Sequence, residues 1–354
     1  MTDSHDDNIR TSLRPECILC GSPGKPLYQG LEDRLFGAPG VWSVDACTNP
    51  ECGLLWLNPA PLKEDMGKAY KTYYTHAQPY PQTTLINRVY WAVRDGYLQA
   101  RFGYLRGVGP RGYRLLAPLA WLHPSGPVKL GADVLYLKAP TPGMRLLEIG
   151  CGDGRFLQRM QALGWNTQGI DPDPQAVEQA RQRGLTVQCG ELFEQNFPDQ
   201  YFDAICMNHV IEHVYDPVGL LVECRRVLKA HGTVTLVTPN TDSLGHQRYG
   251  EDWRGLEPPR HLHLFSPGNL IRAVERAGLN VVTVHTLAKG AAFMLNMSSV
   301  LRRARLSNRG IEECSGGFSR ALGYRLFQIG ERMLLTIRPQ IGEEILLIAG
   351  KTVG

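Results

Sequence analysis

The stretch from residue 144 to residue 290 alternates between short apolar runs and amphipathic runs, and this alternation constrains the fold more than any other feature. Apolar runs typical of strands lie at residues 145–149, 167–170, 186–189, 204–208, 233–238 and 281–286. Helical patterns separate most of them, at residues 155–163, 174–183 and 217–228. Such alternation predicts an α/β domain with a doubly wound, mostly parallel sheet covered by helices on both faces.

The rest of the chain divides into segments that differ in composition from this α/β stretch. The expected division is a flexible tail (1–14), a unit with paired cysteines (15–60), a linker with a basic aromatic helical lid (61–140), the α/β core (141–290) and a helical insertion with a final edge strand (291–354). Within the last segment, helical patterns lie near residues 292–306 and 317–336, and an apolar run at residues 344–350 suits the edge strand.

The overall composition excludes several broad classes of protein. Apolar residues make up 43% of the 354 residues, so global disorder is excluded. The net charge of +4 is too small to indicate a nucleic-acid partner by itself. The longest apolar run, residues 115–122, is far shorter than the ~20 residues that span a bilayer, and the acidic N-terminus does not resemble a secretory signal. We therefore expect a cytoplasmic protein, with peripheral contact at the inner face of the membrane as a further expectation.

A glycine-rich turn follows the first expected strand of the core and opens the first helix. Gly150, Gly152 and Gly154 let the backbone turn sharply and lie against a ligand, and in a doubly wound sheet this turn is a nucleotide-binding position. The spacing is G-x-G-x-G, and Glu148 stands just before it. A negative charge at that point suits a ligand with a cationic amine better than a pyrophosphate.

Two further acids follow the next two expected strands. Asp171 ends the second strand, where a carboxylate can accept hydrogen bonds from a ribose diol. Glu191 follows the third strand and is placed to approach the exocyclic amine of a purine. With Glu148, these acids place one carboxylate at the end of each of the first three expected strands. This arrangement favours a ligand site over an ordinary turn.

The motifs of the core resemble those of class I S-adenosylmethionine-dependent methyltransferases. The resemblance rests on the segment from Glu148 to Gly154, on Gly169-Ile170-Asp171 and on Phe202-Asp203-Ala204-Ile205, and it covers residues 141–290. It implies a seven-stranded Rossmann-like sheet with helical lid insertions, and S-adenosylmethionine as the cofactor.

The resemblance also implies roles for individual residues. Glu148 and Gly150 would lie near the methionine moiety, Asp171 would bind the ribose hydroxyls, and Glu191 would lie near the adenine. Gly152, Gly154 and Asn208 complete the expected set of cofactor-binding residues.

Four cysteines have the spacing of a metal site. Cys17-x2-Cys20 and Cys47-x4-Cys52 are separated by 26 residues, and Gly follows each pair. Each pair can form a tight knuckle that supplies two thiolates to one tetrahedral ion, so the spacing predicts a structural zinc ribbon with no open coordination position. With the Tyr-rich segment that follows, it resembles the zinc-binding leader of bacterial methyltransferases that act on sugars and related metabolites. The other five cysteines are expected to be small core residues.

A cluster of His and Glu follows the fourth expected strand. His209, Glu212 and His213 have the i, i+3, i+4 spacing of one helical face. The H-x-x-E-H string also matches an inverted zinc-protease motif, but Pro217 leaves no room for the long helix which that motif needs. Similar methyltransferases of quinone-type substrates carry an acid-x-x-Glu-His run that holds a divalent cation, whereas His209 replaces the acid here. A general base, a metal site and a purely structural role all stay open.

A second group of histidines follows the fifth expected strand. Arg260 and His261 are candidates for substrate contact or for the base, because loops at strand ends line the site in such folds. His263 is as well explained by a structural role. Ser266 followed by Pro267 is typical of a helix start.

The segment from residue 88 to residue 129 is basic and aromatic, with six Arg and one Lys against a single acid, Asp95. Three interpretations stay open: a solvated helix face, a nucleic-acid surface, and an interfacial segment with Trp and Tyr at the lipid headgroups. The apolar stripe expected at residues 317–336 agrees with the interfacial interpretation or with core packing. The Asn-His-Val run after the fourth strand is not the motif of enzymes that methylate base amines, which makes nucleic acid the less favoured partner.

These observations together predict an enzyme that transfers a methyl group from S-adenosylmethionine to a hydroxyl or carbon acid of a small molecule. A sugar, a glycolipid or another lipid-linked metabolite is the expected substrate, with His209, Glu212, His213 and His261 as the catalytic set. An RNA methyltransferase that binds its substrate through the zinc ribbon and the basic segment is one alternative. A cofactor-binding scaffold without catalysis is the other.

Overall fold

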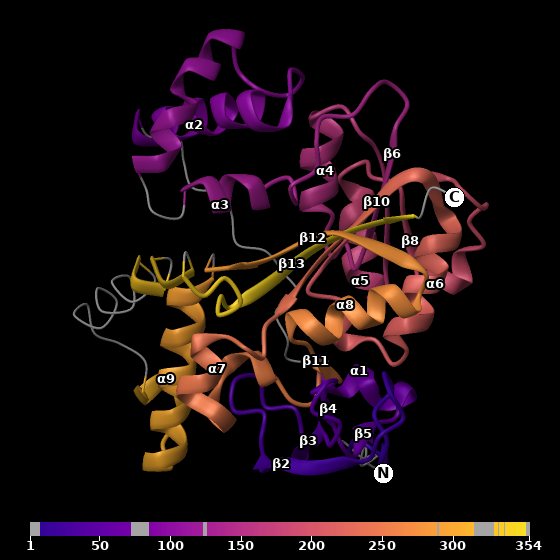
Figure 1. Cartoon of the computed structure of the whole chain (residues 1–354), viewed down its shortest axis with the longest axis vertical. Coiled ribbons are helices and arrows are strands. Elements are labelled where there is room, and N and C mark those ends of the chain that lie inside the picture. The colour runs from indigo at the N-terminus through magenta and orange to yellow at the C-terminus, as the bar shows by residue number, and fades with distance from the viewer. Residues whose placement is uncertain are drawn as a thin grey trace, which may run out of the picture.

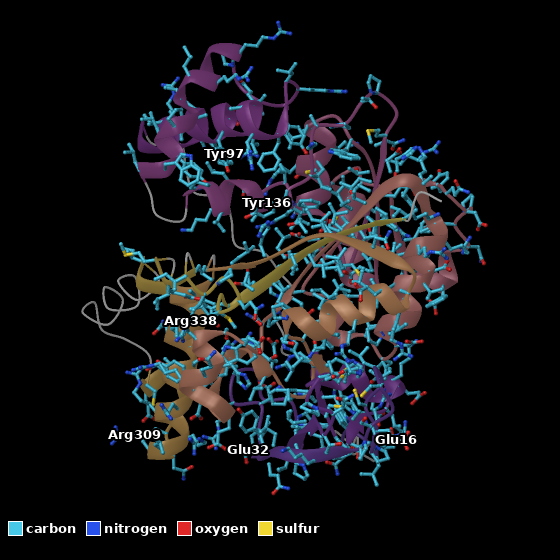
Figure 2. The ribbon with its side chains drawn as sticks, in the orientation of Figure 1. Glu16, Glu32, Tyr97, Tyr136, Arg309 and Arg338 are labelled. Carbon is cyan, nitrogen blue, oxygen red and sulfur yellow. The ribbon has the colours of Figure 1, made fainter. Side chains whose placement is uncertain are left out.

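The structure is a computed structural model that describes residues 8–71, 85–122, 126–288, 290–314, 329–331, 333–335 and 337–351. A central sheet separates a small leader, formed by residues 8–71, from a helical unit at the opposite end of the molecule (Figure 1). Glu16 and Glu32 mark the leader, and Tyr97 and Tyr136 mark the helical end (Figure 2). Among the helices of the described residues, none combines the length and the apolar character needed to cross a bilayer.

The central sheet has seven strands in the order β12-β13-β10-β9-β6-β7-β8. Its strands are β6 (Arg145–Ile149), β7 (Asn166–Asp171), β8 (Val187–Cys189), β9 (Phe202–Asn208), β10 (Leu228–Pro239), β12 (Leu279–Leu287) and β13 (Glu344–Lys351). The strands from β10 to β8 pair in parallel, and β13 runs antiparallel to both of its neighbours. The predicted α/β fold and its strand positions are confirmed.

One detail of the predicted sheet is wrong, because β13 is an interior strand and β12 forms the edge. The apolar side chains of Ile345, Leu346 and Leu347 are buried on alternating faces of the sheet. By contrast, β12 exposes Val282. The unbroken apolar run of β13 is the pattern of a strand covered on both faces, and this pattern argued against an edge position.

The predicted core helices are present, and their starts have a local cause. They are α4 (Arg155–Ala162), α5 (Pro174–Gln182), α6 (Pro217–Val227) and α8 (Pro267–Arg276). The last three each have Pro at the first position, preceded by an N-cap side chain that accepts a backbone hydrogen bond from the first turn, namely Asp173, Asp216 and Ser266.

The leader shares its sheet with the core. Strands β2 (Gly24–Leu31), β3 (Trp42–Cys47) and β4 (Leu55–Leu57) are joined by β11 (His263–Leu264), which comes from the loop after β10. The short strands β1 (Thr11–Ser12) and β5 (Ala60–Pro61) pair with each other, and η1 (Lys63–Asp65) and α1 (Met66–Ala69) follow. Residues 8–14, predicted to belong to a flexible tail, are therefore part of the leader.

The helical unit consists of α2 (Leu85–Phe102) and the 3-10 helix η2 (Arg111–Leu122), and α3 (Gly126–Ala132) joins it to the core. A side chain at Gly96 would collide with the Tyr113 carbonyl, so the absence of a Cβ allows α2 and η2 to lie close together. Leu98, Tyr104 and Trp165 belong to the apolar cluster that joins this unit to one face of the sheet.

The remaining elements surround the loop after β10 and the C-terminal segment. They are η3 (Leu192–Gln195), η4 (Ile211–His213), α7 (Leu244–Tyr249), η5 (Gly250–Asp252), η6 (Arg254–Leu256), α9 (Ala291–Ser307) and α10 (Ile311–Cys314). The helix predicted near residues 292–306 is α9. Most of the helix predicted at residues 317–336, with its stripe of Phe318, Leu322 and Leu326, lies outside the described residues.

Candidate functional site

The glycine-rich turn adopts a conformation that requires glycine. Gly150, Gly152 and Gly154 all have positive φ, of 70°, 51° and 78°. A Cβ at Gly150 would lie 2.5 Å from Val210, and one at Gly154 would lie 2.4 Å from Leu185, whereas the space around Gly152 is open. The turn therefore brings bare backbone to the carboxyl ends of β6 and β9, where ligands bind in such sheets.

Two buried carboxyl groups stand beside this turn. Asp171 accepts hydrogen bonds from the backbone N–H groups of Gly152 and Asp173, at 2.7 and 2.9 Å. Within the described part of the chain, Oε2 of Glu148 is buried and has no hydrogen-bond partner. Burial, with the nearby charge of Asp171, raises the pKa of Glu148 well above its ordinary value. A cationic amine bound here would supply the missing partner, so the pair fits the amine and the ribose of S-adenosylmethionine.

The other two predicted cofactor residues also lie at strand ends. Asn208 is the last residue of β9 and is exposed. Glu191 caps η3, and its half-exposed carboxylate forms an ion pair with Lys63 of the leader at 2.7 Å. Their assignment to the cofactor stays a prediction, and the ion pair shows that the leader reaches this edge of the sheet.

The predicted His/Glu cluster forms around Glu212, which is fully buried in η4. Its carboxylate accepts a hydrogen bond from the Thr238 hydroxyl at 2.9 Å and contacts Nδ1 of His209 at 3.2 Å. Burial raises the pKa of Glu212, but the contact with His209 outweighs it, and the pKa falls to about 2. Glu212 is therefore a buried carboxylate that its histidine neighbours stabilise.

His209 differs from the general base that the sequence predicted. Its Nδ1 faces Glu212, and its Nε2 lies 3.5 Å from Glu344. Partial burial lowers the pKa of His209, but these two carboxylates outweigh it and raise the pKa to about 10. A ring that donates at both nitrogens carries a positive charge near pH 7, so this geometry favours a proton donor over a proton acceptor.

His213 and His261 have the geometry of bases. Nδ1 of His213 lies 2.9 Å from the Arg260 carbonyl, and Nδ1 of His261 lies 2.7 Å from the Gly255 carbonyl. Because a carbonyl only accepts, both Nδ1 atoms carry the proton, and each Nε2 keeps a lone pair. His261 is buried, and burial lowers its pKa to about 4, which makes it a weak base. His213 is only half-buried.

Glu212, His213 and His261 also form a candidate cation site. One potential ligand atom from each lies within 4.8 Å of the others, and the two imidazole rings are 4.7 Å apart. The sequence placed His261 in a separate loop, and the structure brings it to the cluster through the turn after η6. His263 instead bonds to the Val214 carbonyl at 3.0 Å and is buried, in agreement with a structural role.

The leader contributes contacts that sequence reasoning missed. The Tyr70 hydroxyl lies 3.1 Å from Nδ1 of His213. Arg260, predicted to contact substrate, is fully buried and binds Asp33 at 2.8 Å and the Ala69 carbonyl at 2.8 Å. The one signal in the sequence is the Tyr-rich character of the segment around Tyr70, because no local pattern pairs residues that are 143 to 227 positions apart.

The four cysteines of the leader form one cluster. The Sγ atoms of Cys17 and Cys52 are 3.6 Å apart, those of Cys20 and Cys47 are 3.3 Å apart, and all four lie within 4.8 Å of one another. Four thiolates about 2.3 Å from a tetrahedral zinc ion lie roughly 3.8 Å apart. Gly21 and Gly53 have the positive φ that closes each knuckle. The donor set and its spacing fit a structural zinc ion.

The core is similar in sequence to known proteins. Residues 127–284 match the family model described as a methyltransferase domain. The ubiquinone biosynthesis O-methyltransferase of Cereibacter sphaeroides (strain ATCC 17025) is 33% identical over 160 residues, which are 41% of this chain and 65% of that protein. The protein of the same name from Xanthomonas campestris pv. campestris is 31% identical over 170 residues, with 46% and 66% covered. The chain thus spans less than two thirds of the length of these curated relatives.

The fold also resembles solved structures. A methyltransferase from Archaeoglobus fulgidus that depends on S-adenosylmethionine matches with a TM-score of 0.40 and 21% identity, over 59% of this chain and 86% of that one.

Proposed function

Because the chain contains a class I S-adenosylmethionine-dependent methyltransferase domain, we propose that the protein methylates a hydroxyl group of a small molecule. A sugar, a glycolipid or a related metabolite is the proposed substrate class. The observation that carries the proposal is the 2.9 Å contact of His213 Nδ1 with the Arg260 carbonyl, which leaves Nε2 as the acceptor of a histidine that follows β9. The names of the curated relatives, which are O-methyltransferases, support a hydroxyl acceptor.

S-adenosylmethionine, when bound, supplies a methyl group on a sulfonium, already activated toward a nucleophile. Glu148 would pair with its amine, Asp171 with the ribose, and the backbone of Gly150 and Gly152 would lie along the ligand. His213 accepts the proton of the substrate hydroxyl at Nε2 while the oxygen gains the methyl group. The Arg260 carbonyl fixes the His213 ring in the required tautomer.

We further propose that Glu212 stabilises the positive charge that His213 gains. Among the described residues, Glu212 is a fully buried carboxylate within reach of both His213 and His261. The same three residues could instead hold a divalent cation that polarises the hydroxyl. The Cys17, Cys20, Cys47 and Cys52 cluster is proposed to hold a structural zinc ion.

The test is transfer of a labelled methyl group from S-adenosylmethionine into an extract of the source cells, with separation of organic and aqueous products. We expect His213→Gln to lower the rate of transfer by about 10²- to 10⁴-fold and to leave the affinity for S-adenosylhomocysteine unchanged. His231→Gln, at an exposed histidine of β10, is the matched control.

Two results would contradict the assignment. Full turnover by His213→Gln would exclude the base. Loss of activity on chelation under conditions that leave the zinc content at one ion per chain would replace the base with a second, catalytic cation.

A further inference from the structure

The helical unit exposes large apolar side chains that nothing described covers. Within η2, the exposed fractions of Leu115, Leu122 and Trp121 are 85%, 81% and 67%. Other exposed apolar residues of the unit are Val89, Tyr90, Trp91, Leu105 and Leu119. A concentration of large apolar side chains on one small unit marks an interaction surface.

The charges on this surface all have the same sign. Between residues 88 and 122, the exposed charged side chains are Arg88, Arg101, Arg106, Arg111 and Arg114. The one acid of this stretch, Asp95, is half-buried and is bound to Arg94 at 2.9 Å and to the backbone N–H of Gly109 at 2.8 Å. The surface is therefore apolar and positively charged, without acidic groups to balance the exposed arginines.

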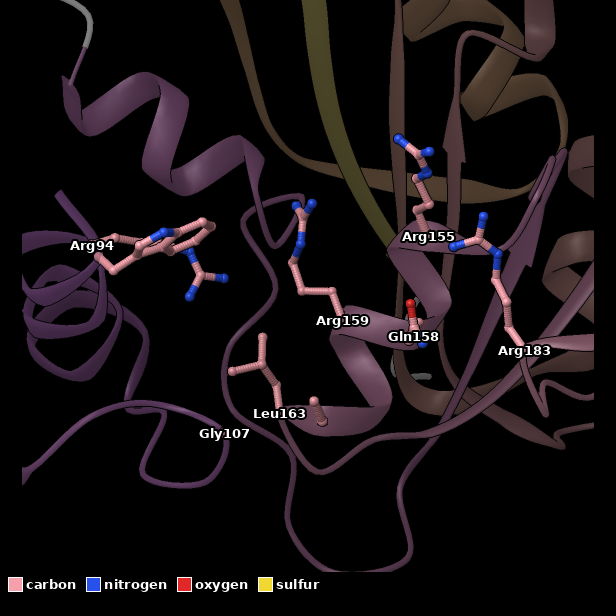
Figure 3. A pocket seen from close by; sticks show the side chains of 9 residues that line it. Arg94, Gly107, Arg155, Gln158, Arg159, Leu163 and Arg183 are labelled. Atoms are coloured by element: carbon pink, nitrogen blue, oxygen red, sulfur yellow. The ribbon is translucent and has the colours of Figure 1, made fainter. Parts of the chain in front are cut away.

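A cavity lined by arginines adjoins this surface. It has a volume of about 530 Å³ and lies between α2 and α4 (Figure 3). Its polar lining is Arg94, Arg155, Gln158, Arg159 and Arg183. Trp91 lines the cavity and is also one of the exposed apolar residues, so the cavity opens beside them. These arginines already pair with carboxylates, Arg94 and Arg159 with Asp133, and Arg155 and Arg183 with Asp153. The positive charge offered to a partner is therefore that of the exposed arginines of α2, η2 and the loop between them.

We propose that the surface formed by α2 and η2 docks the protein on a bilayer that contains anionic lipid. Leucine and tryptophan side chains would enter the headgroup region, and the exposed arginines would contact lipid phosphates. None of the exposed residues named for this surface belongs to the proposed base or cofactor site, so the inference does not depend on the proposed function.

Other partners fit the surface less well. A nucleic-acid surface uses aromatic rings on which bases stack, whereas four of the exposed apolar residues are leucines: Leu105, Leu115, Leu119 and Leu122. A second copy of this chain would bring one positively charged surface against another and be repelled. A bilayer with anionic lipid satisfies both the apolar and the charged groups.

The experiment is flotation of the full chain with vesicles of phosphatidylcholine, with and without 30% phosphatidylglycerol. We expect binding to the anionic vesicles at 0.1 M salt, and at least tenfold weaker binding to neutral vesicles or at 0.5 M salt. The variants L115S/W121S/L122S and R111Q/R114Q should each weaken binding by roughly tenfold. Leu13→Ser and Lys25→Gln are matched controls, because they remove an exposed leucine and an exposed cation of the leader, at the opposite end of the molecule.

Unchanged thermal unfolding of the variants would show that any loss of binding is not loss of the fold. The proposal is overturned if the wild-type chain does not float with anionic vesicles at 0.1 M salt, or if Leu13→Ser and Lys25→Gln weaken binding as much as the η2 variants. It is also overturned if the η2 variants bind vesicles normally and lose affinity for RNA oligonucleotides instead.

Discussion

Two segments precede the core in the chain, and they are joined to it by different interactions. The leader shares a sheet with β11 and is joined by the buried ion pair between Arg260 and Asp33. The helical unit is joined mainly by apolar packing, to which Tyr104 adds hydrogen bonds with the Leu137 carbonyl at 3.1 Å and with Trp165 at 3.3 Å. One charged link accompanies this packing, because the buried Arg94 of α2 pairs with Asp133 at 3.2 Å and Arg159 of α4 donates to the Asp133 carbonyl. A buried charge left without its partner is costly, so the leader depends chiefly on its ion pair, whereas the helical unit depends on buried area together with the Arg94 pair.

The leader and the helical unit also differ in their contacts with the candidate site. Lys63 and Tyr70 of the leader contact Glu191 and His213, which stand at the strand ends. The helical unit contacts the core through the apolar cluster that contains Tyr97, Leu98 and Ala120, and its exposed side chains lie outside that cluster. Changes that unfold the leader should therefore alter the candidate site, whereas substitutions of exposed residues of the helical unit should not.

The largest expected effect on the leader is that of losing its metal ion. We expect Cys47→Ser, or removal of zinc by a chelator, to unfold the leader, because structural zinc contributes about 10 kcal/mol or more to folding of such units. The loss should extend to β11 and to His261, since β4 and β11 are paired. Hydrogen exchange across residues 8–71 and 257–266 measures both effects.

The matched control for this prediction is Cys189→Ser. Cys189 was expected in the core with the other cysteines outside the cluster, and this expectation is wrong because Cys189 is exposed. Fast exchange in the leader combined with full protection of residues 257–266 would show that the two parts fold independently. A zinc content far below one ion per chain would refute the site.

The buried ion pair provides the next largest expected effect. We expect Arg260→Met to destabilise the protein by about 3–5 kcal/mol, because Asp33 and Glu257 would be left buried without their cation. Arg34→Met is the control, since the pair of Arg34 with Glu32 is exposed and should contribute less than about 1 kcal/mol. Urea denaturation measures both, and equal losses would show that the Arg260 pair does not hold the leader to the core.

The charge on His209 predicts how stability depends on pH. The folded-state pKa of about 10 lies above the ordinary value of 6.5, so this contribution is complete below pH 6.5 and is lost as pH rises through about 10. The pKa of Glu212 is lowered from 4.5 to about 2, so its contribution is present above pH 4.5 and is lost as pH falls toward 2. Stability from this pair should be greatest between pH 4.5 and 6.5.

The measurement is the urea midpoint at pH 6, 8 and 9.5 for the wild type, His209→Gln and His231→Gln. His209→Gln should remove part of the decline in the urea midpoint between pH 6 and pH 9.5. The difference should be about 1 kcal/mol or less, because the side chain of His209 is 38% exposed to solvent. An identical decline in all three proteins would mean that His209 is neutral, which would restore it as a candidate base.

The sequence predicted those features that depend on residues close to one another in the chain. The alternating runs located the strands, and the glycines with positive φ followed from the turn that they form. The cysteine pairs predicted their cluster because each knuckle is local and the ion requires four ligands. The edge position predicted for β13 is wrong, although its unbroken apolar run is typical of a strand covered on both faces. The run does not specify which two strands are its neighbours.

The contacts of the candidate site were only partly predictable for the same reason. The i, i+3, i+4 spacing brought His209, Glu212 and His213 together, but it could not show that Glu344 would give His209 a second carboxylate. Arg260 was assigned to the substrate because it stands in a strand-end loop. Its partner Asp33 lies in the leader. Arg260 is buried and paired only because the leader packs against the core, and no sequence pattern shows that packing.

The smallest expected effect concerns the surface of the helical unit. Because the side chain of Leu115 is 85% exposed, Leu115→Ser should change the free energy of unfolding by no more than about 0.5 kcal/mol. Leu98→Ala, at a fully buried leucine of α2, should cost about 2–5 kcal/mol and shows whether the urea measurement detects the unit. If Leu115→Ser were as costly as Leu98→Ala, η2 would be packed against another part of the chain, and the contrast between the two segments would fail. A small effect would show that the exposed side chain of Leu115 does not contribute to the stability of the fold. That result is expected of a side chain that contacts a binding partner.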